Sequence, residues 1–109
     1  MDSETKVHEL KEKIKAFCEQ RNWNEVHTAK ELAIGMITES AELLEHFRFK
    51  SEEQVEEMFL DKKKKAEIEE EIGDLLLFLL RFCQKYDIDI TTEFHKKLEK
   101  TEKKYPSKK

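Results

Sequence analysis

Glycine and proline are scarce in this chain of 109 residues, which has two glycines and one proline. Sandwiches and barrels need many turn-forming residues, so this scarcity argues against them and favours long helices. Long apolar runs are missing too, since no stretch approaches the roughly 20 residues that a membrane-spanning helix needs. The N-terminus, Met1 to Thr5, is polar and acidic, unlike a secretory signal. We therefore expect an all-α cytoplasmic protein with no membrane partner.

The chain also lacks an excess of positive charge and any closely spaced pair of cysteines. Lys and Arg number 21 against 25 Asp and Glu, a formal charge of -4, so no surplus charge is available to hold a phosphate backbone. Nucleic acid is therefore not an expected partner. Cys18 and Cys83 lie far apart among apolar neighbours, which predicts buried packing in a reducing compartment instead of a zinc site or a disulfide.

Hydrophobic periodicity predicts a single domain, residues 1–109, with four main helices and a short one. The predicted ranges are 3–19, 28–47, 51–60, 63–86 and 91–104. Thr28 and Glu31 predict a reciprocal capping box at the start of the second helix, and Ser51 and Gln54 repeat the pattern at the third.

The second and fourth of these helices are more apolar than a helix with one solvated side requires. Residues 75–80 are six consecutive apolar residues, which cover every direction around a helix. Four helices cannot surround both apolar helices completely, so an apolar face is left for another subunit. The sequence therefore predicts an oligomer.

Acidic residues inside these two apolar helices are the strongest anomaly. Glu39 and Glu42 lie three residues apart, about 60° around a helix, and Glu71 and Asp74 repeat the spacing. A carboxylate that faces a core costs several kcal/mol unless it is paired or bound to metal. Two such pairs on facing helices would form a cage of oxygen ligands, which favours Mg²⁺ or Mn²⁺ over zinc.

Chance is the competing interpretation of this spacing in a chain with 25 acidic residues. Glu53 with Glu56 shows the same spacing in a polar segment, where solvation is its expected state. Iron is disfavoured because a di-iron bundle needs Glu-x-x-His pairs, and His46 lies one residue off that spacing from Glu42. Gly73, inside the second acidic motif, costs about 1 kcal/mol relative to alanine, which suggests a close backbone approach there.

Three motifs follow one another in order between Phe17 and Pro106. They are Arg21-Asn-Trp23-x-x-x-His27-Thr28-x-Lys30, then Glu39-x-x-Glu42 with Glu71-x-x-Asp74, then Lys97-x-x-Lys100-x-x-x-Lys104-Tyr105-Pro106. In this order they resemble the MazG-like nucleotide pyrophosphohydrolases, in particular the dCTP pyrophosphatase-like branch. The resemblance implies a four-helix bundle-like MazG fold and a homotetramer whose active sites lie near subunit interfaces.

The resemblance also implies Mg²⁺-dependent hydrolysis of a nucleoside triphosphate to the monophosphate and pyrophosphate. The implied substrate is dCTP or a related pyrimidine deoxynucleotide, and the implied purpose is sanitation of the nucleotide pool. Glu39, Glu42, Glu71 and Asp74 match the metal ligands. Either Glu39 or Glu42 would also accept a proton from the attacking water, and the sequence does not say which.

Eight further residues match positions that contact the substrate in that family. Lys30, Lys97, Lys100 and Tyr105 match positions that contact phosphates or help to close the site, and Trp23, His27, Phe47 and Phe49 match positions near the base and sugar.

Besides Gly73, three positions depart from the pattern of that branch. Phe49 stands where it often has tryptophan, and Glu31 and Thr101 stand where asparagine is frequent. Hydrolase chemistry is therefore a firmer expectation than dCTP specificity. The alternatives are a pyrophosphatase of the same fold with a broad or purine-directed range, and a non-catalytic helical domain whose inward acids pair with a partner's basic residues.

Overall fold

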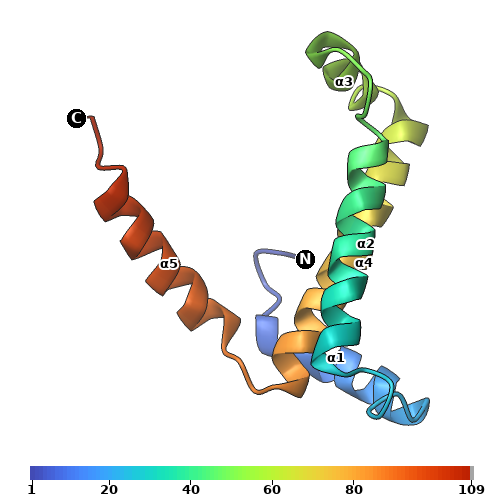
Figure 1. The fold of residues 1–109 in the computed structure, drawn as a ribbon, viewed down its shortest axis with the longest axis vertical. Helices are drawn as coiled ribbons and strands as arrows, with labels where there is room; N and C mark the ends of the chain where they lie inside the picture. Colours follow the sequence, from blue (N-terminus) through green and yellow to red (C-terminus); the bar gives the residue numbers. More distant parts are fainter. Residues whose placement is uncertain (109) are drawn as a thin grey trace.

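The computed structural model describes residues 1–108, and every regular element in that part of the chain is a helix. The helices are α1 (Val7–Gln20), α2 (Ala29–Glu45), α3 (Glu52–Met58), α4 (Lys62–Lys85) and α5 (Ile90–Lys104). Figure 1 shows α2 and α4 running side by side in opposite directions, with α1 crossing them near one end. The prediction of an all-α fold with four main helices and one short helix is confirmed.

Side chains at the helix starts explain where several of these helices begin. The predicted capping box of α3 is complete, because the Ser51 hydroxyl accepts from the Gln54 amide and the Gln54 side chain accepts from the Ser51 amide. At α2 the Thr28 hydroxyl accepts from the Glu31 amide, but the reciprocal bond from Glu31 is not among those formed in the described chain. The predicted box at α2 is therefore only half formed.

Close packing of α2 on α4 depends on a glycine. A Cβ atom placed on Gly35 would lie 2.4 Å from the ring of Phe78, so only glycine lets the ring of Phe78 sit against α2. A Cβ atom on Gly73 would meet nothing within 4 Å. The prediction of a close approach at Gly73 is therefore wrong. The position where α2 and α4 are too close for a side chain is Gly35.

The buried core of the chain is small. Its apolar members are Cys18, Leu32, Met58, Ile68, Leu80 and Cys83. Both cysteines are buried and free, as their apolar neighbours predicted. No helix in the described residues combines the length and apolar character that crossing a membrane requires.

Helix α5 extends away from the other helices (Figure 1). None of its residues is buried, and Phe94 on its first turns is 61% exposed. The radius of gyration is 16.9 Å, whereas a compact chain of this length has about 13 Å. Within one chain, α1, α2 and α4 pack together and α5 does not complete the bundle.

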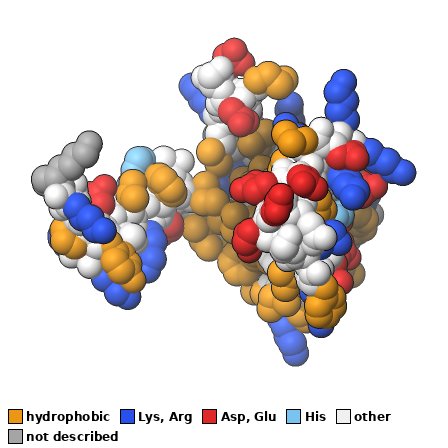
Figure 2. All heavy atoms as spheres, turned by 90° about the horizontal axis from the view of Figure 1, so that it is seen from above, with side chains coloured by type: hydrophobic (Ala, Val, Ile, Leu, Met, Phe, Trp, Pro, Cys, Tyr) orange, Lys and Arg blue, Asp and Glu red, His pale blue; other side chains and the backbone are white. Residues whose placement is uncertain are grey.

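The two apolar helices are not covered on all sides within one chain. Ile37 and Leu44 of α2 are exposed, as are Ile72, Leu76 and Leu77 of α4. Figure 2 shows hydrophobic side chains across the flank of the main body that faces the α5 arm. The apolar face that the sequence predicted is present in the structure.

Candidate functional site

One stripe of residues on α2 faces one stripe on α4, and together they form the α2–α4 seam. The stripes are Leu32, Gly35, Glu39, Glu42 and His46 on α2 and its C-terminal cap, and Glu71, Asp74, Phe78, Arg81 and Lys85 on α4. Their alternating spacings of three and four keep each stripe on one helix face. Contacts at both ends fix the register of the seam.

At one end, the Nε2 atom of His46 lies 3.6 Å from the Oε1 atom of Glu71. In the middle, Phe78 fills the notch at Gly35. At the other end, Arg81 donates to His27, which lies just before α2, at 3.0 Å. The antiparallel register therefore places the acidic residues of both helices at the same level of the seam.

Three of the four predicted metal ligands converge. Carboxylate oxygens of Glu39, Glu42 and Glu71 all lie within 4.8 Å of one another. Asp74 is outside that set, but its negative charge acts on Glu39. We call Glu39, Glu42, Glu71 and Asp74 the carboxylate cluster.

Two oxygens of the carboxylate cluster have no donor. The Oε2 atoms of Glu39 and Glu71 are buried and have no hydrogen-bond partner among the described residues. A buried acceptor without a donor is costly, and a bound cation would satisfy both oxygens. Because every candidate ligand is a carboxylate oxygen, the cluster fits Mg²⁺ or Mn²⁺, which prefer oxygen ligands.

The concentration of negative charge in the cluster also favours a bound cation. Burial raises the pKa of Glu39 to about 7, helped by its closeness to Glu42, with which it can share a proton, and by the charges of Asp74 and Glu71. Like charges held close together disfavour ionisation, and a divalent cation among them reverses that effect. His46, which does not have the Glu-x-x-His spacing of a di-iron site, lies beside Glu71 at the edge of the cluster.

Two predicted substrate residues lie together in the loop between α1 and α2. The rings of Trp23 and His27 are 5.3 Å apart, and the ring of Phe17 meets Trp23 edge-on at 5.6 Å. Lys30 follows on the first turn of α2, where it is exposed. This loop therefore offers an aromatic surface at the end of the seam where α2 begins.

The two predicted phenylalanines lie beyond the other end of α2 and differ in their surroundings. Phe47 stacks on Phe59 of the α3 turn, with ring centroids 6.0 Å apart, so it has a packing role. Phe49 is 93% exposed, and the guanidinium of Arg48 lies 4.7 Å from its ring centroid.

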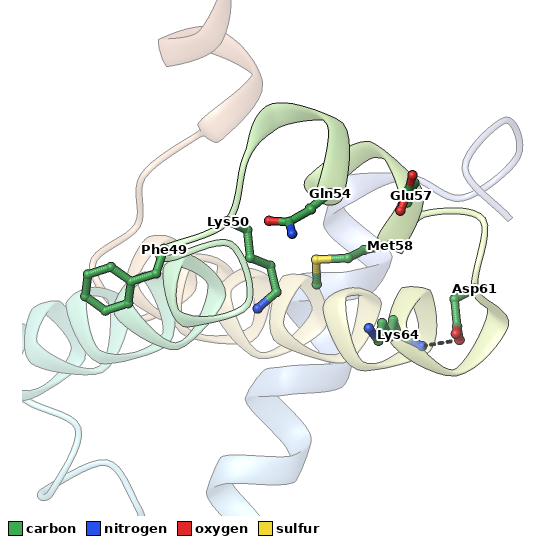
Figure 3. A pocket seen from close by; sticks show the side chains of 7 residues that line it. All are labelled: Phe49, Lys50, Gln54, Glu57, Met58, Asp61 and Lys64. Atoms are coloured by element: carbon green, nitrogen blue, oxygen red, sulfur yellow. Dashed lines mark hydrogen bonds between the residues drawn. The ribbon is translucent and has the colours of Figure 1, made fainter.

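Phe49 lies at the rim of a pocket of about 470 Å³ beside α3 (Figure 3). Lys50 and Lys64 also line that pocket, and none of the carboxylate cluster does. The pocket and the cluster are therefore separate features of this chain.

The remaining predicted residues are Lys97, Lys100 and Tyr105, all exposed on or just after α5. Because α5 extends away from α2 and α4, one chain does not bring them to the carboxylate cluster (Figure 1). Their contact with phosphates stays a prediction that requires a second chain.

Sequence reasoning missed a group of polar residues at the loop end of the seam. Arg81 is buried and donates hydrogen bonds to Asn24, His27 and Gln84. Its signal in the sequence is a lone arginine directly after the apolar run, seven residues from Asp74 and therefore on the same helix face.

The chain is all-helical, and carboxylates from two facing helices converge in it, which is the donor arrangement by which helical bundles hold divalent cations. Comparison with known proteins makes the assignment specific. The chain belongs to the MazG-like family, whose family model matches residues 34–109.

A solved structure supports the same assignment. The crystal structure of a pyrophosphatase from Archaeoglobus fulgidus is similar to this chain with a TM-score of 0.85 and 38% identity, covering 92% of each chain. Among curated proteins, dCTP pyrophosphatase 1 of Rattus norvegicus is 26% identical over 90 residues, which are 83% of this chain and 53% of that protein. The Homo sapiens protein of that name is 23% identical over 91 residues, 84% of this chain and 54% of that protein. The chain thus spans about half the length of these curated relatives.

Proposed function

We propose that this chain is a Mg²⁺-dependent nucleoside triphosphate pyrophosphohydrolase. Its proposed substrate is dCTP or a related pyrimidine deoxynucleotide, which it cleaves to the monophosphate and pyrophosphate. Removal of surplus or modified nucleotides from the cytoplasmic pool is the proposed role. The observation that carries the proposal is the carboxylate cluster, with two donorless buried oxygens, in a chain 38% identical to a pyrophosphatase.

Glu39, Glu42, Glu71 and Asp74 would hold the cation. When bound, a divalent cation would neutralise the charge of the triphosphate oxygens and lower the pKa of a water molecule. Glu39 and Glu42 are the two candidates to accept the proton of the attacking water. Trp23 and His27 would contact the base, where an aromatic ring can stack on a pyrimidine, and Lys30 would contact phosphate.

The test is a pyrophosphate-release assay with a panel of nucleoside triphosphates and MgCl₂. Fastest release from dCTP supports the full proposal. Similar rates across the panel, or a preference for purines, would overturn the pyrimidine specificity and support the broad-range alternative. No release with any nucleotide at micromolar enzyme would overturn the enzyme proposal and favour a helical interaction domain.

We also propose that copies of this chain assemble, as a homotetramer in which sites are shared. The accessible surface is 9127 Å², whereas a folded 13.1 kDa monomer exposes about 6,400 Å². The excess is larger than the roughly 800 Å² that one partner buries in a standard interface. Other copies covering α5 and the exposed faces of α2 and α4 would account for it. A monomer by light scattering at micromolar concentration would overturn this assembly.

Mixing two inactive variants tests whether the sites are shared. Glu39→Gln removes a proposed metal ligand, and Lys97→Ala with Tyr105→Phe removes proposed phosphate contacts on α5. If α5 serves a neighbour's carboxylate cluster, co-refolded mixtures regain activity, because some interfaces combine an intact cluster with an intact α5. Proven hybrid oligomers that stay as inactive as their parents would place each site within one chain.

A further inference from the structure

The side chain of Arg81 is the largest fully buried side chain in the described residues, and it is 2% exposed. Its Nε atom donates to His27 Nδ1 at 3.0 Å, its Nη2 atom to Asn24 Oδ1 at 2.6 Å, and its Nη1 atom to Gln84 Oε1 at 2.5 Å. All three acceptors are neutral, and no ion pair among the described residues includes Arg81. A guanidinium keeps its charge at any ordinary pH, so a buried cation is held here by neutral groups.

A buried charge is costly unless its hydrogen bonds are satisfied, and a leucine here would avoid that cost. Arg81 instead ties the loop between α1 and α2 to α4, through Asn24 and His27. Lys85, one turn further along α4, donates to the backbone carbonyls of the same two loop residues. The loop has a residue with positive φ, Asn22 at 56°, so its conformation is not one that the chain adopts by itself at no cost.

The bond from Arg81 also determines how His27 presents its ring. Nδ1 accepts from the guanidinium and also lies 3.8 Å from the Sγ atom of Cys18, so the single hydrogen of the neutral ring is on Nε2. Burial, with the charges of Arg81 and Lys85, holds the pKa of His27 below its usual value and keeps the ring neutral. The ring therefore offers one donor, Nε2–H, next to the Trp23 ring.

The loop and the carboxylate cluster are separated along α2 by a distance that suits a nucleotide. Helix α2 begins at Ala29, and Glu39 is ten residues further along, about 15 Å at the rise of an α-helix. On α4, Arg81 follows Asp74 by two turns on the same face. This separation would allow a nucleotide whose triphosphate lies at the cluster to reach the loop between α1 and α2 with its base.

We propose that Arg81 is a positioning residue for substrate: it fixes the loop that carries Trp23 and His27, and it holds His27 as the Nε2–H tautomer, a ready-made donor to an acceptor on the edge of a nucleobase. Arg81 itself contacts no substrate. This inference rests on the proposed function for the identity of the ligand. The tautomer of His27 is inferred from the hydrogen bonds of its ring and does not depend on that function.

The test compares the wild-type protein with Arg81→Lys, which keeps the charge but loses the forked donors. The matched control is Arg48→Lys, at an exposed arginine paired with Glu45. The first readout is the ¹⁵N NMR signature of the His27 ring without nucleotide. We expect the Nε2–H tautomer in the wild type and the control, and a mixture of tautomers in Arg81→Lys. An unchanged ring signature in Arg81→Lys would overturn the inference.

The second readout is steady-state kinetics with the best nucleotide of the panel. Arg81→Lys is expected to raise KM about tenfold with kcat within threefold, since the loop is loosened and the carboxylate cluster is left intact. A fall in kcat with unchanged KM would overturn the positioning role. Asn24→Ala removes one acceptor and keeps the bond from Arg81 to His27, so it should raise KM by a smaller factor and leave the His27 ring signature unchanged. If Arg81→Lys fails to fold, Asn24→Ala replaces it in the kinetic readout, where an unchanged KM would overturn the positioning role.

The two readouts separate this inference from the proposed function. A changed His27 ring in a protein that hydrolyses no nucleotide would refute the proposed function and the substrate part of the inference, and would support Arg81 as the clamp of the loop. If the protein hydrolyses nucleotides but Arg81→Lys changes neither the His27 ring signature nor KM, the proposed function is supported and the positioning role of Arg81 is overturned.

Discussion

The α2–α4 seam and helix α5 are built from similar local signals but end in opposite states. Both regions begin at capped helix N-termini, through Thr28, Asp61 and Asp89. In the seam, the two helices then meet at three levels: His46 with Glu71, the carboxylate cluster, and Gly35 with Phe78. In α5 the ion pairs join residues of the same helix, such as Lys103 with Glu99, and no residue is buried.

The contrast shows that the interactions that form a helix differ from those that form the carboxylate cluster. Caps and pairs at i,i+3 or i,i+4 contribute a few tenths of a kcal/mol each, and isolated helices of this length are marginal in water. One chain therefore gives α5 no packing partner of the kind that α2 and α4 give each other. The carboxylate cluster exists only where two helices face each other, and changes there should have the largest effects.

The largest expected effect is on activity, from changes in the carboxylate cluster. Glu42→Gln and Asp74→Asn should each lower turnover by at least about 100-fold, because each removes a charged oxygen ligand. Neither change should unfold the metal-free protein, since clustered carboxylates repel one another. Pyrophosphate release and thermal unfolding measure the two effects, and Glu53→Gln is the silent control. Near-normal turnover with unchanged Mg²⁺ affinity would refute the ligand assignment.

The next largest effect is on stability, from the two glycines. Gly35→Ala should lower the free energy of unfolding by about 1 to 3 kcal/mol, because the Phe78 ring must leave the seam. Gly73→Ala should raise it by about 0.5 to 1 kcal/mol, since alanine is the better helix former and the space is open. Denaturant titration of both variants checks the pair. Equal effects would show that the close contact at Gly35 does not limit packing.

A smaller effect is expected on self-association, from α5. Leu98→Ser removes an exposed apolar side chain of α5 and should weaken assembly about tenfold if another copy covers it. Glu102→Ser is the matched control on the same helix and should leave the dissociation constant unchanged. Sedimentation over a concentration series gives both constants. An identical constant for Leu98→Ser and the wild type would place the interface elsewhere.

The smallest effect is a pH dependence that belongs to the seam alone. The pKa of Glu39 is raised from its ordinary value of 4.5 to about 7, so between these values the folded protein binds more protons than the unfolded chain. Stability of the metal-free protein should therefore fall as pH rises from about 4.5 to about 7. Glu39→Gln should flatten this slope in unfolding curves measured across that range. An unchanged slope in that variant would assign the effect to another group.

Much of this protein was predictable from its sequence, because helix formation is a local property. The helices, the complete cap at Ser51 and the burial of both cysteines follow from spacing, side-chain chemistry and apolar neighbours. The carboxylate spacing also predicted that Glu39, Glu42 and Glu71 would come together, because a carboxylate on an apolar helix is costly unless it is paired or bound to a cation.

Only the tertiary structure decided which residues face each other across the seam. The sequence suggested a close approach at Gly73 and gave no such signal at Gly35, but the crossing of α2 and α4 places the Phe78 ring over Gly35 and nothing over Gly73. In the same way, the helical period places Arg81 on the face of Asp74, yet only the register of the two helices brings it to His27. Such contacts depend on where two helices cross, and no local pattern of residues carries that information.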